Sequence, residues 1–126
     1  MKAKTPEDVD RLFGERVNAG DLDGLVALYE PTATLATEDA GNVIGHDAIR
    51  AYLATLVGMK ATIDMGTYRV IPAGDGLAVV HHDWQATIAT PDGQEMTMTG
   101  KATEVVRRQP DGSWLFALDE PNMRGS

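Results

Sequence analysis

Three short turn sequences in the second half of the chain constrain its fold more than any other feature. They are AGDG at 73–76, TPDGQ at 90–94 and QPDGS at 109–113, and they separate four stretches rich in threonine, valine, isoleucine and methionine. In Pro-Asp-Gly, proline presets φ and glycine accepts a positive φ, which is the chemistry of tight turns. Three such turns between four strands of roughly ten residues predict an antiparallel meander.

The first half of the chain predicts helices instead, because its apolar residues recur at helical spacing. Thr5 and Pro6 supply a hydroxyl N-cap and a proline at the first helical position. We expect helices over about 6–17, 22–29 and 46–57, with a brief extended segment at 32–37 before the third. Helices followed by a long sheet indicate an α+β protein whose helices cover one face of the sheet.

Length, charge and cysteine content narrow the class of protein. The 126 residues are expected to form a single domain over 1–126, structured over about 5–121, with 122–126 as a tail. The absence of cysteine excludes disulfides, thiolate zinc sites and cysteine nucleophiles. A net charge of −8 makes nucleic acid and anionic membranes poor partners. With no apolar leader and no membrane-length apolar run, we expect a cytoplasmic protein.

The sequence HHDWQ, at 81–85, gathers more functional side chains than any other stretch and suggests a metal site at first reading. Side chains of a strand alternate between its two faces, so His82 and Trp84 share one face and His81 and Asp83 the other. Two ligands on one face are fewer than the three or more that divalent metal sites usually take. We therefore expect no metal site here.

Three longer stretches resemble a known superfamily. They are NAGDLDGLVALYEPTATL at 18–35, GHDAIRAYL at 45–53 and GKATEVVRRQPDGSWLFALDEP at 100–121. They resemble the nuclear-transport-factor-2-like superfamily, and within it the SnoaL-like and ketosteroid-isomerase-like small proteins. The resemblance implies a cone-shaped fold, in which a curved antiparallel sheet wraps N-terminal helices around a deep, mostly apolar pocket. It also implies a homodimer formed through the outer face of the sheet.

The resemblance leaves the function open, because this fold hosts isomerases, cyclases, dehydratases, epoxide hydrolases and binding modules without catalysis. Ketosteroid isomerase uses an aspartate base beside a tyrosine and a protonated aspartate. The resemblance places Thr37, Phe13 and Glu104 at these three positions. Only Glu104 keeps its chemistry, and Glu38 could replace Thr37 only through a register slip. The residues therefore argue against a steroid isomerase.

Glu104 is the strongest candidate for chemistry, and Asp119 is its possible partner. Glu104 shares a strand face with Ala102 and Val106, where burial would raise its pKa toward neutrality; the alternative is an exposed strand glutamate. A two- or four-residue loop at QPDGS would put Asp119 opposite Glu104. A three-residue loop would put the two on opposite faces, and Asp119 would then be a strand-end cap.

We predict a cofactor-independent acid/base enzyme of the isomerase, cyclase or dehydratase type, acting on a small apolar or polycyclic molecule. Glu104, His82 and Asp119 are the candidate catalytic residues, although His82 could instead be a buried neutral histidine. Trp84 would form a pocket wall, or simply pack in the core. The candidate ligand-binding residues are Trp84, Phe13, Tyr29, Thr37, Tyr52 and Met98. A small-molecule-binding protein without catalysis is the alternative.

Overall fold

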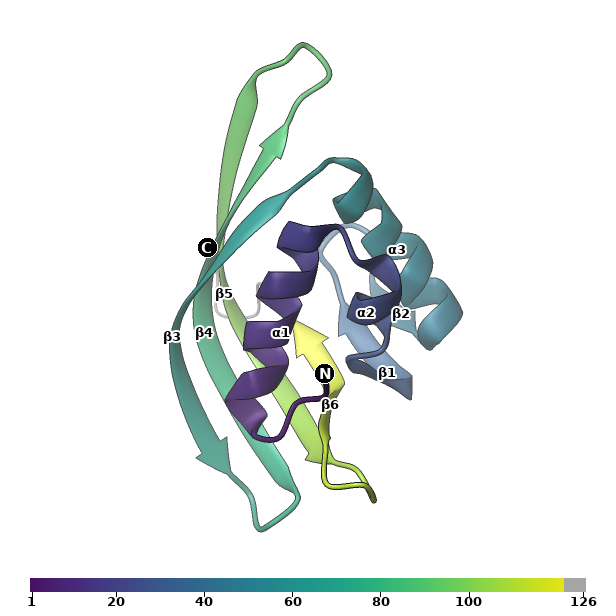
Figure 1. The fold of residues 1–126 in the computed structure, drawn as a ribbon, viewed down its shortest axis with the longest axis vertical. Helices are drawn as coiled ribbons and strands as arrows, with labels where there is room; N and C mark the ends of the chain where they lie inside the picture. The colour runs from purple at the N-terminus through teal and green to yellow at the C-terminus, as the bar shows by residue number, and fades with distance from the viewer. Residues whose placement is uncertain (122–126) are drawn as a thin grey trace.

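A computed structural model describes residues 1–121 of the chain (Figure 1); the predicted tail at 122–126 lies outside the described residues. The elements, in chain order, are α1 (Pro6–Ala19), α2 (Leu22–Val26), β1 (Tyr29–Ala36), β2 (Asn42–Ile44), α3 (His46–Gly58), β3 (Thr62–Pro72), β4 (Leu77–Ala89), β5 (Glu95–Arg108) and β6 (Trp114–Glu120). The predicted α+β class is confirmed.

The strands form one six-stranded sheet in the order β2-β1-β6-β5-β4-β3. Strands β3 to β6 pair antiparallel in sequence, which confirms the meander that the turn sequences predict. Strand β1 pairs with β6 in parallel, and β2 pairs antiparallel with β1. The sheet is therefore mixed. The extended segment predicted before the third helix lies largely in β1, between the edge strand β2 and the central strand β6.

The strongly curved sheet wraps around α1, while α2 and α3 lie beside β1 and β2 (Figure 1). Helix α1 contacts β3, β4, β5 and β6 from inside this curve. Its buried residues Val9, Leu12 and Val17 enter the main core together with Phe116 of β6. The burial of apolar surface between them holds the helix against the concave face of the sheet.

The second helix ends earlier than its apolar spacing predicts. It ends at Val26, and Tyr29 opens β1 instead of closing the helix. The backbone N–H of Phe116 donates to the carbonyl of Leu28 at 2.8 Å, which draws this segment onto β6. Tyr29 is fully buried against Phe116, with ring centroids 4.9 Å apart. Pairing and packing with a distant strand here override the local helical pattern.

The turn QPDGS has a three-residue loop, because Gln109 and Ser113 pair across it and Gly112 adopts a φ of 87°. A regular ladder from this turn would place Glu104 opposite Leu118. A register shift between Val105 and Val106 intervenes, and it leaves Ala117 as an extra residue in β6. Glu104 therefore pairs with Asp119 after all. The expectation that a three-residue loop separates the two carboxyls was wrong, because a β-bulge restores their pairing.

No helix among the described residues is long and apolar enough to cross a membrane.

Candidate active site

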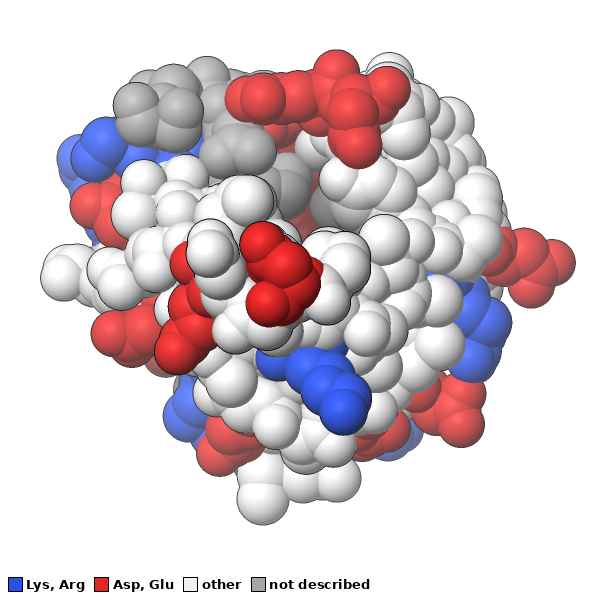
Figure 2. Space-filling view, turned by 90° about the horizontal axis from the view of Figure 1, so that it is seen from above, with Lys and Arg blue, Asp and Glu red and all other residues white. Residues whose placement is uncertain are grey.

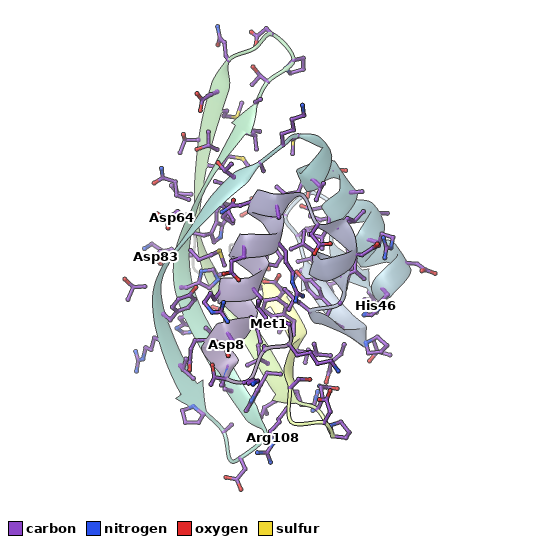
Figure 3. The ribbon with its side chains drawn as sticks, in the orientation of Figure 1. Met1, Asp8, His46, Asp64, Asp83 and Arg108 are labelled. Atoms are coloured by element: carbon purple, nitrogen blue, oxygen red, sulfur yellow. The ribbon has the colours of Figure 1, made fainter. Side chains whose placement is uncertain are left out.

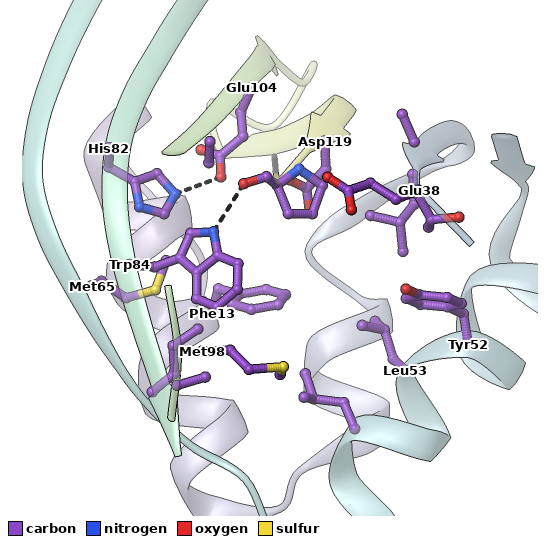
Figure 4. A pocket seen from close by; sticks show the side chains of 18 of the residues that line it. Phe13, Glu38, Tyr52, Leu53, Met65, His82, Trp84, Met98, Glu104 and Asp119 are labelled. Carbon is purple, nitrogen blue, oxygen red and sulfur yellow. Dashed lines mark hydrogen bonds and ion pairs between the residues drawn. The ribbon is translucent and has the colours of Figure 1, made fainter. Parts of the chain in front are cut away.

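A cavity of about 320 Å³ lies between the concave face of the sheet and the helices. Strands β4, β5 and β6 supply one wall, and α3 with the end of β1 supplies the other (Figure 4). All nine residues predicted for catalysis or ligand binding line it: Phe13, Tyr29, Thr37, Tyr52, His82, Trp84, Met98, Glu104 and Asp119. His82, Trp84 and Glu104 lie on the cavity side of their strands, which is the side that strand alternation assigns to them.

A buried histidine–glutamate pair forms part of the cavity lining. His82 of β4 and Glu104 of β5 are 2% and 3% exposed, and a hydrogen bond joins His82 Nε2 to Glu104 Oε2 at 2.7 Å (Figure 4). The two residues come from adjacent strands, with His82 opposite Ala102 and Glu104 opposite Val80. Their side chains share the concave face of the sheet, so they reach one another across the ladder.

Asp10 of α1 joins this pair and was missed by the sequence analysis. It is fully buried, and its Oδ1 lies 3.4 Å from His82 Nε2. Neither of its carboxylate oxygens accepts a hydrogen bond from the residues that the structure describes. Helical spacing contained the signal, because Asp10 precedes Phe13 by three residues and Val17 by seven, and both face the core. An acidic residue at this spacing indicates a carboxyl that faces the core.

A second buried carboxyl lies beside this cluster. Asp119 is 5% exposed, and the hydroxyl of Tyr29 donates to its Oδ2 at 2.6 Å. The hydroxyl of Tyr29 therefore points toward the buried carboxyl of Asp119, and it comes from the start of β1 and not from a helix. Phe13 of α1 lines the same cavity without a hydroxyl, and Tyr29 brings a phenol to it from another element.

Burial and mutual repulsion change the acidities of these groups. Burial raises the pKa of Glu104 well above its ordinary value, and the charges of Asp10 and Asp119 raise it further. Burial also raises the pKa of Asp119, to about 7, although the hydrogen bond from Tyr29 acts in the opposite direction. For His82, burial lowers the pKa but Asp10 and Asp119 outweigh it, so the pKa stands above its ordinary value.

Trp84 forms a wall of the cavity and is held in place by two contacts. Its indole N–H donates to the backbone carbonyl of Pro121 at 3.0 Å. Trp84 pairs with Gly100 across the β4–β5 ladder, and a Cβ at Gly100 would lie 2.4 Å from the indole ring. The missing side chain at Gly100 is therefore what allows the ring to lie over the neighbouring strand.

The end of β1 forms an acidic mouth. The Thr37 hydroxyl accepts from the backbone N–H of Ala40 at 2.9 Å and donates to the carbonyl of Gly41 at 2.8 Å, which closes a tight turn. This turn carries Glu38 and Asp39, which are exposed and line the cavity. The hydroxyl of Tyr52 donates to Asp39 at 3.2 Å. The hydroxyl of Thr37 thus shapes the mouth of the cavity.

Asp10, His82 and Glu104 each place one potential ligand atom within 4.8 Å of the others. Two nitrogen or oxygen ligands about 2.1 Å from one ion stay roughly 3 Å or more apart at common coordination angles. His82 Nε2 and Glu104 Oε2 are closer than that, at 2.7 Å, and this is a hydrogen-bond distance. The geometry favours a shared proton over a metal ion between these two residues.

The remaining histidines lie elsewhere. His46 is the first residue of α3, and its Nε2 lies 2.7 Å from the carbonyl oxygen of Tyr29 in β1. His81 is half-buried and Asp83 is exposed, both on the opposite face of β4 from His82. The division of HHDWQ between two faces therefore follows the predicted alternation.

We expect Asp10→Asn to lower the pKa of His82, because the Asp10 carboxylate is one of the charges that raise it. The measurement is an NMR titration of the imidazole protons, with the His82 signal assigned by His82→Gln. Asp8→Asn on the same helix is the control and should leave that titration unchanged. A pKa in Asp10→Asn equal to or above the wild-type value would contradict the role assigned to this carboxylate.

The comparisons with known proteins agree with this architecture. A family model described as a SnoaL-like domain matches residues 9–116, and the chain belongs to this family. The chain has no significant match among curated proteins.

Solved structures match over nearly the whole chain. A nuclear-transport-factor-2-like superfamily protein from Salmonella enterica serovar Typhimurium has a TM-score of 0.79 at 20% identity, over 94% of this chain and 89% of that chain. A ketosteroid isomerase-like protein from Erwinia carotovora atroseptica has a TM-score of 0.81 at 16% identity, over 95% and 94%. An epoxide hydrolase/cyclase-like enzyme of pyran ring formation in salinomycin has a TM-score of 0.70 at 19% identity, over 92% and 88%. At these identities the likeness establishes the fold and the predicted cone.

Proposed function

We propose that this protein is a cofactor-independent acid/base enzyme that transfers protons to and from a small apolar molecule bound in the cavity. The observation that carries the proposal is the 2.7 Å hydrogen bond between His82 and Glu104, both buried and both part of the cavity lining. A proton-sharing pair next to an apolar binding space is what general acid/base catalysis requires.

Glu104 is the proposed general acid. Burial raises the pKa of its carboxyl well above the ordinary value, which favours the protonated form that can donate a proton to a substrate oxygen or carbon. His82, whose Nε2 contacts the same carboxyl, would return a proton to Glu104 after the transfer. Asp119 has a pKa of about 7 and would accept the proton that the substrate loses. The substrate has then gained one proton and lost one. His82 is one proton short and Asp119 has one extra, and exchange of that proton through solvent restores both groups, so the cycle needs no cofactor.

Reactions that fit this cycle are isomerisation, cyclisation and dehydration. Each needs one proton added at one atom and one removed at another, within a space that excludes water. The aromatic side chains of Phe13, Tyr52 and Trp84 would hold a planar or polycyclic substrate between them.

A small-molecule-binding protein without catalysis is the second candidate. Two residues favour it. Phe13 cannot supply the hydroxyl donor, and Thr37 cannot supply the carboxylate base, that a ketosteroid isomerase has at these positions. In that case Glu104 and His82 would only satisfy a polar group of the ligand.

Solvent deuterium exchange separates the two candidates. A panel of bicyclic and tricyclic ketones with acidic C–H bonds is first screened for binding by thermal shift. Each ketone that binds is then incubated in deuterium oxide, and incorporation at the carbon next to the carbonyl is followed by NMR. We expect at least one bound ketone to exchange faster with the protein than without it. Binding with no accelerated exchange for any ketone would favour the second candidate.

Two further expectations belong to the proposal. The outer face of the sheet, which carries the half-buried Val79, Val105 and Leu118, is the proposed surface of a homodimer. Sedimentation of the wild type against Val105→Glu would test it, because a charge there should dissociate the dimer. A cytoplasmic location is also proposed.

A further inference from the structure

The ionisable groups around the cavity are almost all acidic. Among the described residues that line it, Glu38, Asp39, Glu104 and Asp119 are acidic, His82 is the one basic group, and no lysine or arginine is present. Asp10 adds a fifth carboxyl behind His82. Figure 2 likewise shows more acidic than basic side chains on the face seen from above, in a chain whose net charge is −8.

The deep end of the cavity has unused capacity to accept hydrogen bonds. Glu104 Oε1 is buried, belongs to a residue that lines the cavity and has no hydrogen-bond partner among the described residues. Figure 4 shows the carboxyl groups of Glu104 and Asp119 at the same end of the cavity, next to the indole of Trp84. A buried acceptor without a donor costs about 1–3 kcal/mol, more when it is charged, so a ligand that donates there gains that energy back.

The sign of the potential at this end selects the charge of the ligand. The carboxylates that hold the proton on Glu104 would repel an oxyanion placed beside it, and they would attract a cation for the same reason. The aromatic faces of Trp84, Phe13 and Tyr52 are compatible with a cation as well, because ring faces carry partial negative charge. His82, the one basic side chain of the described lining, already contacts Glu104 Oε2, and no lysine or arginine of that lining competes for Glu104 Oε1 or for Asp119.

We propose that the cavity takes an amine: a ligand with an apolar body of one to three rings and a positively charged nitrogen placed against Glu104 and Asp119. This inference rests on the proposed function, since it names the substrate class of the same site. Glu38 and Asp39 at the mouth would draw such a cation toward the cavity. The ring body would lie between Met98 and Leu53, below the carboxyl groups.

Three probes with one ring skeleton test the charge directly: aminotetralin, tetralol and tetralin carboxylate, with the substituent on the same carbon. Their affinities are measured by isothermal titration calorimetry at pH 8. We expect the amine to bind roughly tenfold or more tighter than the alcohol, since a hydrogen bond to a charged group is stronger than a neutral one. The carboxylate should bind most weakly. Asp119→Asn should reduce the preference of the cavity for the amine over the alcohol.

Proton release is the second measurement. The amine should displace the proton of Asp119, so its binding enthalpy near pH 7 should depend on the ionisation enthalpy of the buffer, while that of the alcohol should not. Its affinity should also rise with pH through about 7, the pKa of Asp119. An alcohol that binds as tightly as the amine, or an amine that fails to bind at millimolar concentration, would overturn the inference.

The outcomes separate this inference from the proposed function. Glu104-dependent exchange of neutral ketones, together with no preference for the amine, would refute the amine ligand and leave the acid/base function standing. A preference for the amine without exchange of any bound ketone would refute catalysis and leave the amine as the ligand of a binding protein.

Discussion

Glu104→Gln should slow the exchange of a bound ketone by roughly 10²–10⁴-fold, the usual contribution of one general acid or base. Glutamine keeps the shape of the side chain and a hydrogen-bonding group next to His82 Nε2, but it cannot give or take a proton at neutral pH. The ketone should bind with little change, so the loss should appear in the exchange rate of the saturated protein.

Glu95→Gln is the matched control, because Glu95 lies on the same strand, is exposed and does not line the cavity. It should exchange the ketone at the wild-type rate. Thermal unfolding of both variants shows whether each is folded. If folded Glu104→Gln retained the wild-type rate of exchange, Glu104 would not be the acid, and the proposed proton cycle would be wrong.

Asp119→Asn should make the protein more stable than wild type at pH 8. Burial raises the pKa of Asp119 from 3.8 to about 7, so the folded state binds this proton more tightly than the unfolded state. The wild type should therefore lose stability as the pH rises from about 4 to about 7. A pKa shift of this size corresponds to at most about 4 kcal/mol in the free energy of unfolding. Asparagine has no charge to bury, and its oxygen can still accept from Tyr29.

Urea unfolding at pH 4 and pH 8 measures this effect, with the difference between variant and wild type expected to shrink toward zero at pH 4. Asp111→Asn is a control of opposite sign. Hydrogen bonds from Lys2 and Ser113 lower the pKa of exposed Asp111, so its charge supports the fold at neutral pH and loses that effect as the pH falls. Asp111→Asn should not gain stability at pH 8. A wild-type protein whose stability is flat between pH 4 and pH 8 would contradict the buried, protonated Asp119.

Local sequence signals predicted the meander, the helices and the face to which His82, Trp84 and Glu104 belong. These signals are strong because turn residues and alternation act within a few residues. The parallel pairing of β1 with β6 was not predicted, since it joins residues about ninety positions apart, such as Tyr29 and Phe116. That pairing also explains why Tyr29 lies in a strand although its neighbours are spaced like a helix.

Two features of the site had weaker signals. Asp10 was overlooked because an acidic residue in the first turns of a helix is normally exposed and favourable with the helix dipole. Its burial depends on β4 and β5 bringing His82 and Glu104 against α1, which no local pattern records. The bulge at Ala117 has no signature in the sequence either, since alanine takes part in regular strands and in bulges alike.

Because Ala117 is surplus to the β5–β6 ladder, a relative that lacked this residue would have a straight strand with the same two carboxyls face to face. The spacing between the Pro-Asp-Gly turn and the second acid can therefore differ by one between proteins that share the site. When sequences of this family are compared, the partner of Glu104 is better located by its cross-strand neighbour than by counting from the turn. An alignment that forbids a gap in this strand would pair Asp119 with an outward-facing residue and hide the shared carboxyl.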